Sequence, residues 1–179
     1  MKNKITLSGL AGSGKTTIGK LLAEKLSYKF ISLGNFARKI AKEKYNMNIN
    51  EFQNYCSKHP EIDYEIDNEF KKYCNETNKI IIDYRLGFHF IDNALNVFLK
   101  VSEGEAAKRL FRAKRSSEFG IQNEDDIKQT MNKRNIKMKE RFIKIYNVDF
   151  TELSNYDTII DTDKFTEFSD IVNLITSEL

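Results

Sequence analysis

An eight-residue stretch, GLAGSGKT, runs from Gly9 to Thr16 and fills the pattern G-x-x-x-x-G-K-[ST] without a mismatch. Glycines let the backbone turn back so that successive N–H groups point at a phosphate chain. Lys15 can reach β- and γ-phosphates, and the hydroxyl of Thr16 is a ligand for Mg²⁺. The pattern predicts binding of a nucleoside triphosphate with Mg²⁺. We expect the triphosphate to lie along the whole loop, which comprises Gly9, Leu10, Ala11, Gly12, Ser13, Gly14, Lys15, Thr16 and Thr17.

The elements on either side of this loop support the same interpretation. Residues 4–8 form a short run typical of a β-strand, and residues 15–26 have the periodicity of a helix. The helix N-terminus adds a partial positive charge where the phosphates would lie. A glycine-rich turn without a ligand is the alternative, and the strand–loop–helix context makes it the weaker one.

Composition excludes several other classes of protein. The chain has 179 residues, 40% hydrophobic and 31% charged, as in one soluble globular domain. No apolar run approaches the roughly 20 residues that span a bilayer, and a strand so near the first residue leaves no room for a signal peptide. A net charge of +3 does not favour nucleic acid. We therefore expect a cytoplasmic monomer in which Cys56 and Cys74 are unpaired thiols.

Strand-like and helix-like segments alternate along the chain. Such alternation predicts an α/β fold: a doubly wound parallel sheet of about five strands with helices on both faces. The expected strands are 4–8, 28–32, 79–83, 97–101 and 158–161, and the expected helices are 15–26, 36–45, 51–58, 61–75, 104–114, 124–146 and 166–178. We expect Asn50 to cap the helix over 51–58 and Pro60 to start the next one.

Two segments interrupt the alternation, and they narrow the function. About 40 residues between the second and third strands are helical, and a smaller basic segment lies between the helix at Lys108 and the helix from Glu124. The wider basic cluster from Lys108 to Arg141 predicts an anionic partner. A kinase for a small acceptor commonly closes mobile elements over its substrates. The guanine-reading sequence Asn-Lys-x-Asp of GTPases is absent. We divide the single domain into a core (1–34, 79–111 and 124–179), a helical acceptor-binding insertion (35–78) and a short lid (112–123).

A series of segments in a fixed order carries a more specific signal. Besides the loop, it includes residues 31–38 (ISLGNFAR), 60–67 (PEIDYEID), 82–87 (IDYRLG), 145–149 (IYNVD) and 156–162 (YDTIIDT). In this series the chain resembles the cytidylate kinase family, in particular its archaeal-type branch among the P-loop nucleoside monophosphate kinases. The resemblance implies transfer of the γ-phosphate of ATP to CMP or dCMP with Mg²⁺. A P-loop kinase for another acceptor (AMP, a nucleoside or a metabolite) and a non-catalytic nucleotide-binding module are the alternatives.

The resemblance also implies roles for individual residues. Planar guanidinium groups grip phosphate oxygens with two hydrogen bonds, and catalysis of this kind is mostly alignment and charge stabilisation. The implied catalytic residues are Lys15, Arg112, Arg115, Arg134 and Arg141, and the implied acceptor-binding residues are Ser32, Gly34, Arg38 and Arg85. Asp83 would orient Mg²⁺ through water, pair with an arginine, or be a plain strand-end acid. Thr162 would lie beside the adenine of ATP or serve a simple turn.

Four residues depart from the pattern of the family. Asn35 stands where an acid is expected, and Tyr84 stands where a glycine is expected. Lys137 and Met138 replace the usual Ser-Glu pair or acid between the two arginines of the long helix. These departures leave the identity of the acceptor open.

Overall fold

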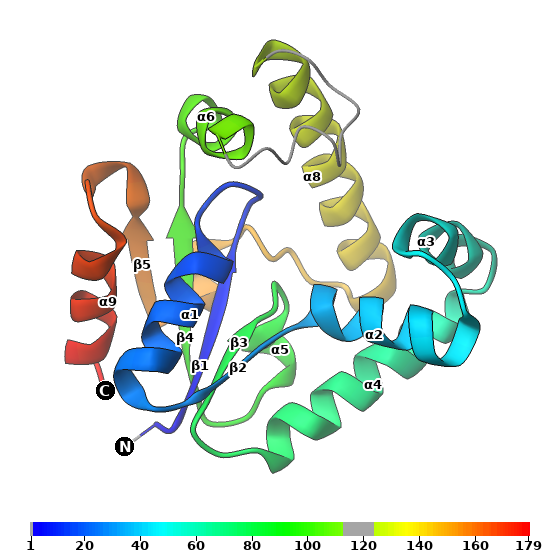
Figure 1. Cartoon of the computed structure of the whole chain (residues 1–179), viewed down its shortest axis with the longest axis horizontal. Coiled ribbons are helices and arrows are strands. Elements are labelled where there is room, and N and C mark those ends of the chain that lie inside the picture. The colour runs from blue at the N-terminus through cyan, green and yellow to red at the C-terminus, as the bar shows by residue number, and fades with distance from the viewer. Residues whose placement is uncertain (1, 113–123) are drawn as a thin grey trace.

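The computed structural model describes residues 2–112 and 124–179. Within these ranges one sheet of five parallel strands forms the centre of the molecule, in the order β2-β3-β1-β4-β5 (Figure 1). The strands are β1 (Lys4–Gly9), β2 (Lys29–Ser32), β3 (Ile80–Asp83), β4 (Ala94–Lys100) and β5 (Thr158–Asp161). Because β1 is central and strands that follow one another in the chain are joined by helical segments, the predicted doubly wound sheet is confirmed.

Helices occupy most of the remaining described residues. They are α1 (Lys15–Leu26), α2 (Leu33–Tyr45), α3 (Ile49–Lys58), α4 (Pro60–Glu76), α5 (Gly87–Phe90), α6 (Glu103–Arg112), α8 (Glu124–Tyr146) and α9 (Phe168–Ser177), with single 3₁₀ turns over Leu153–Asn155 and Thr162–Lys164. None of them is long and apolar enough, in the part of the chain that the structure describes, to cross a membrane.

Each face of the sheet buries a separate core. Ile5 and Leu7 of β1 pack with Ile18 and Leu22 of α1, and α9 completes this layer. On the opposite face, α4 and the last turns of α8 cover β3, where Phe70 is fully buried. The near-continuous apolar strands predicted for a parallel sheet are therefore present, since both faces are covered. Cys74 lies in the second core, and neither Cys56 nor Cys74 forms a disulfide; burial raises the pKa of Cys74 to about 12.

Three helices, α2 to α4, lie between β2 and β3 and share a small core around Phe52 and Ile62. Pro60 starts α4, as predicted. The predicted cap at Asn50 is wrong, because α3 begins at Ile49. Asn48 takes that place: its Oδ1 accepts from the N–H of Glu51, and Glu51 Oε2 accepts from the N–H of Asn48. This reciprocal pair is a capping box.

The long helix α8 packs against α6 beyond the carboxyl ends of the strands (Figure 1). Ala106 and Leu110 of α6 meet Ile127 and Met131 of α8 in this layer. The predicted lid, 112–123, lies outside the described residues except for Arg112. The division into core, insertion and lid stays a prediction.

Candidate phosphate-binding and acceptor site

The candidate site lies at the carboxyl edge of the sheet, where the loop after β1 turns into α1. Gly12 has φ +81° and Gly14 has φ +86°, in the left-handed region that favours glycine. A Cβ on Gly12 would stand 2.7 Å from the Cβ of Ala106, so the loop also touches α6 closely. The loop conformation therefore depends on its glycines, as the pattern predicted.

Lys15 is buried, and its ammonium group lies folded back over the loop. Its Nζ donates to the carbonyl oxygens of Gly9 and Leu10, both at 2.8 Å, and to Oγ of Ser13 at 3.3 Å. These bonds satisfy a charge that burial largely removes from water. The ammonium is therefore held inside the loop, at the position where a phosphate chain would meet it.

Thr16 and Asp83 form the second feature of the site. The hydroxyl of Thr16 donates to Oδ2 of Asp83 at 2.8 Å, and both residues are partly exposed. A hydroxyl and a carboxylate are hard oxygen ligands of the kind that Mg²⁺ takes, directly or through water. The donor set therefore fits the magnesium ion that the loop motif implies.

Arg85 follows Asp83 on the connection after β3, and its Nε is buried without a hydrogen-bond partner. Burial lowers the pKa of Arg85, the negative charge of Asp83 opposes that effect, and the positive charge of Arg134 adds to it. Oγ of Ser8 donates to the carbonyl oxygen of Arg85 at 3.0 Å. A cation whose buried N–H has no hydrogen-bond partner is costly unless an anion completes it. Arg85 thus has the chemistry of a phosphate ligand.

A buried tyrosine supports the backbone at this point. The hydroxyl of Tyr156 lies 2.9 Å from Oγ of Ser8 and 2.7 Å from the carbonyl oxygen of Phe150, to either of which it can donate. Burial raises the pKa of Tyr156, so the hydroxyl stays protonated. Sequence reasoning missed this support, since it assigned no role to Ser8 or to Tyr156, the first residue of the segment 156–162.

Three of the other predicted arginines lie on α6 and α8, beyond the carboxyl ends of the strands. Arg112 is the exposed last residue of α6. Arg134 and Arg141 are exposed on α8, where Arg134 is near enough to Arg85 to affect its pKa and Arg141 to affect that of Tyr146. The structure therefore brings Arg85 and Arg134 together, whereas Arg115 lies outside the described residues.

Ser32, Gly34 and Arg38 lie where β2 passes into α2. Oγ of Ser32 caps this helix by accepting from the N–H of Asn35 at 3.2 Å, and Nη1 of Arg38 donates to Oδ1 of Asn35 at 3.2 Å. A Cβ on Gly34 would make only an ordinary contact with Arg38. Arg38 is exposed. These residues share the first turn and a half of α2, and Arg38 is accessible to a ligand.

A groove of about 380 Å³ lies between α6 and the turn after β5. Arg109 in its wall donates to Oγ1 and to the carbonyl oxygen of Thr162, at 2.9 and 3.2 Å, and to Glu105 at 3.0 Å. Thr162 is fully buried, and its hydroxyl donates to the carbonyl oxygen of Lys100. Thr162 therefore joins β4, β5 and α6. Thr162 does not line the groove itself, but it holds Arg109, which does. Arg109 was not among the predicted site residues.

Two of the four residues that depart from the family pattern, Tyr84 and Met138, pack into the core of the molecule. Tyr84 is 3% exposed, and its hydroxyl donates to Oδ1 of Asp67 at 3.3 Å, while the hydroxyl of Tyr146 bonds Oδ2 of the same carboxylate. Met138 packs in the same aromatic cluster, whereas Lys137 is exposed. The bulky side chain of Tyr84, which stands where a glycine is expected, thus lies in the core.

The parallel sheet of this strand order, with a phosphate loop after its first strand, defines the P-loop, nucleoside monophosphate kinase-like fold. Shikimate kinase from Bacteroides thetaiotaomicron has the same fold, with a TM-score of 0.68, 20% identity and coverage of 98% of each chain. The chain belongs to the cytidylate kinase-like family, whose model matches residues 4–164. The family predicted by resemblance is thereby confirmed.

Two relatives mark the position of the chain within the family. It is 37% identical to a cytidylate kinase from Pyrococcus furiosus over 163 residues, which are 90% of this chain and 81% of that protein. It is 51% identical over 174 residues to an S-adenosylmethionine-dependent nucleotide dehydratase from Lacinutrix mariniflava. The match covers 96% of this chain but spans only 35% of the length of that relative.

Proposed function

We propose that this chain is an ATP-dependent nucleoside monophosphate kinase that transfers the γ-phosphate of ATP to CMP or dCMP. The observation that carries the proposal is the adjacency of three groups: the hydroxyl of Thr16, the carboxylate of Asp83 and the partly buried guanidinium of Arg85. Thr16 belongs to the loop that binds the triphosphate, and Arg85 is a cation suited to binding the phosphate of the acceptor. Membership of the cytidylate kinase-like family and the Pyrococcus furiosus relative support the same activity.

The reaction needs little acid–base chemistry from the protein. The phosphate of a nucleoside monophosphate is already an anionic nucleophile, so alignment and charge stabilisation supply most of the rate. Lys15 binds the β- and γ-phosphates, while Arg38 and Arg85 hold the acceptor phosphate in line. Arg112, Arg134 and Arg141, together with Arg115 outside the described residues, neutralise the charge that spreads over the transferring group.

Thr16 directly, and Asp83 through water, are the residues that would hold Mg²⁺. When bound there, the ion would neutralise negative charge on the β- and γ-phosphate oxygens. We place the adenine of ATP in the groove beside Arg109 and Thr162, because that groove opens between α6 and the turn after β5, next to the phosphate loop. The stacking face of a guanidinium suits a purine.

An acceptor panel tests the proposal. ADP release from Mg-ATP is measured with CMP, dCMP, UMP, AMP, GMP and dTMP. Fastest release with the two cytidine nucleotides is the expected result. Fastest release with another acceptor would show a kinase of different specificity, and no acceptor-dependent release would favour a nucleotide-binding module.

The Lacinutrix mariniflava relative favours a second, compatible role. In that protein a segment 51% identical to this chain is joined to a longer chain, and the whole is named a nucleotide dehydratase. We infer that phosphorylation by this chain supplies a nucleotide for dehydration. The test is mass spectrometry of nucleotides after incubation of this chain, ATP, CMP and S-adenosylmethionine with a dehydratase. Loss of water that depends on this chain is expected; loss at the same rate without it would contradict the role.

A further inference from the structure

A carboxylate that the proposed reaction does not use lies at the junction of α4, the connection after β3 and the end of α8. Asp67 of α4 accepts through Oδ1 from the hydroxyl of Tyr84 at 3.3 Å, and through Oδ2 from the hydroxyl of Tyr146. We call these three side chains the carboxylate–phenol cluster. Hydrogen bonds to an ionised carboxylate are stronger than those between neutral groups. One side chain therefore joins three separate segments of the chain.

Both phenols of the cluster keep their protons, so both remain donors to the carboxylate. Burial, followed by the negative charge of Asp67, raises the pKa of Tyr84 above its ordinary value. Burial, followed by the hydrogen bond to Asp67, raises the pKa of Tyr146. The ring of Phe90 packs on both tyrosines, with its centroid 6.0 Å from that of Tyr84 and 5.1 Å from that of Tyr146. The two hydroxyl groups are therefore held in place by ring packing as well as by their hydrogen bonds.

Two of the joined segments carry arginines with a role in the proposed reaction. Tyr84 directly precedes Arg85 in the sequence, and the N–H of Tyr84 donates to the carbonyl oxygen of Leu7 at 3.2 Å. Tyr146 is the last residue of α8, which also carries Arg134. Burial lowers the pKa of Arg85 most, and the charge of Arg134 lowers it further. The cluster therefore ties the backbone at Arg85 to the helix that bears the neighbouring cation.

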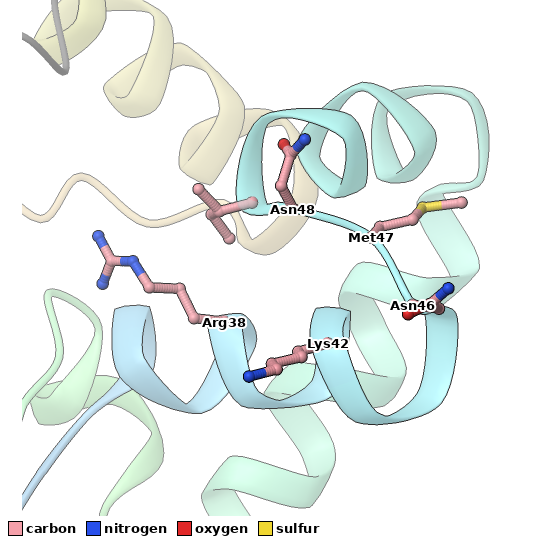
Figure 2. A pocket seen from close by; sticks show the side chains of 6 residues that line it. Arg38, Lys42, Asn46, Met47 and Asn48 are labelled. Carbon is pink, nitrogen blue, oxygen red and sulfur yellow. The ribbon is translucent and has the colours of Figure 1, made fainter.

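The third joined segment is the helical insertion, which carries Arg38 on α2. The helices α2 and α4 pack together through a shared core, in which Ile40 of α2 and Ile66 of α4 are both buried. Ile66 is the neighbour of Asp67 in the sequence, so a movement of α4 at the cluster would also move α2. Figure 2 shows Arg38 extending from α2 away from the turn that leads to α3. The position of its guanidinium therefore depends on how α4 is held.

We propose that Asp67 and Tyr84 are positioning residues for phosphoryl transfer, and that Tyr84 sets the place of Arg85 relative to Arg38 and Arg134. This inference rests on the proposed function. Arginines on three segments can hold one phosphate in line only when those segments keep a fixed arrangement, and a displacement of about 1 Å can cost a factor of about 100 in rate. The resemblance predicts a glycine at position 84, and glycine has no hydroxyl to donate to Asp67. The bond from Tyr84 is thus a feature in which this chain departs from the pattern of its family.

Removing one hydroxyl group at a time tests the proposal. Tyr84→Phe and Tyr146→Phe each remove one hydrogen bond to Asp67 and keep the ring, and Tyr73→Phe on the exposed face of α4 is the matched control. We expect Tyr84→Phe to lower kcat/KM for the acceptor about 10- to 100-fold, with the KM for ATP unchanged. Tyr146→Phe should act in the same direction. An equal loss in Tyr73→Phe, or equal losses toward ATP and the acceptor, would overturn the proposal.

A double-mutant cycle separates positioning from a purely structural role. Tyr84→Phe is combined with Arg85→Met, and kcat/KM is taken from initial rates at low acceptor concentration. If Tyr84 acts through Arg85, its hydroxyl should matter by less than about twofold once the guanidinium is absent. The same loss with and without Arg85 would show that Tyr84 only stabilises the fold, and it would overturn the proposal.

A calorimetric titration of CMP without ATP distinguishes a failure of this inference from a failure of the proposed function. If the wild-type protein binds CMP but phosphorylates no acceptor of the panel, and Tyr84→Phe weakens the binding, the positioning role is supported and the kinase activity fails. If the wild-type protein is an active kinase and Tyr84→Phe matches it, the positioning role is overturned and the kinase activity stands. A wild-type protein that neither binds nor phosphorylates any acceptor of the panel would overturn both.

Discussion

The hydroxyl of Thr16, the last residue of the phosphate-loop motif, donates a 2.8 Å hydrogen bond to Oδ2 of Asp83, the last residue of β3. The two belong to segments 67 residues apart in sequence. The pairing of Leu7 with Asp83 in the parallel ladder brings them together. The bond joins the loop proposed to bind ATP to the strand that leads to Arg85, which is proposed to bind the acceptor phosphate. It therefore links the donor side and the acceptor side of the proposed reaction.

Asp83→Asn tests the metal half of this relationship. The amide keeps the shape and can still bond Thr16, but it removes the charge that attracts Mg²⁺. We expect the Mg²⁺ concentration for half-maximal activity to rise about 10- to 100-fold, as for other outer ligands of metals. A magnesium titration of initial rates measures this effect. Asp170→Asn, on the exposed side of α9, is the control. An unchanged Mg²⁺ requirement in Asp83→Asn would leave Asp83 as a plain strand-end acid.

Arg85→Met tests the acceptor half. Burial lowers the pKa of Arg85, and its Nε has no partner, so the folded protein carries the cost of holding this charge. Replacement by an apolar side chain of similar length should leave the free energy of unfolding unchanged or raise it by about 1 kcal/mol. Activity should fall at least about 100-fold.

Thermal unfolding and steady-state kinetics of Arg85→Met measure the two effects side by side. A Tm several degrees lower with an unchanged KM for the acceptor would mean that Arg85 is structural.

Asp149 gives a prediction for pH. Burial alone would raise the pKa of Asp149, but hydrogen bonds from Lys139 and Thr151 outweigh it and lower the pKa below its ordinary value of 3.8. Nζ of Lys139 lies 2.7 Å from Oδ2 of this carboxylate. A lowered pKa in the folded state stabilises the protein above pH 3.8, and this contribution is lost as the pH falls through the folded pKa.

We expect Asp149→Asn to lower the free energy of unfolding by up to about 1 kcal/mol at neutral pH, since the ion pair with Lys139 is partly exposed. At a pH below the folded pKa of Asp149, the substitution should change this free energy very little. Urea unfolding at pH 7 and at the lowest pH at which the protein stays folded measures the difference. An equal loss of stability at both pH values would show that the carboxylate charge has no part in it.

Much of the fold was predictable from local patterns. Regular apolar runs identified all five strands, and the sequence GLAGSGKT located the loop between β1 and α1. The start of β4 was placed three residues late, at Val97, because Asn96 is typical of a turn. Inside the sheet its side chain accepts from Thr6 at 2.7 Å, a contact between strands that sequence spacing does not reveal.

Other elements were missed for physical reasons. The four-residue helix α5 is too short for periodicity, and it depends on Gly87 lying against Thr6 of β1. The cap of α3 was predictable, since Asn48 and Glu51 have the three-residue spacing of a capping box. The contacts of Arg109 with Thr162 and Glu105 were not predictable, because they depend on which face of α6 meets the turn after β5.

The central claim is tested most directly by following the γ-phosphate of labelled ATP in the presence of Mg²⁺ and CMP. Lys15→Ala is the control, with circular dichroism to confirm that it folds. We predict that the label appears in CDP with the wild-type protein and that transfer falls by a factor of about 10³ or more in the variant. Label found only in ATP and inorganic phosphate, or transfer that persists without Lys15, would contradict the account.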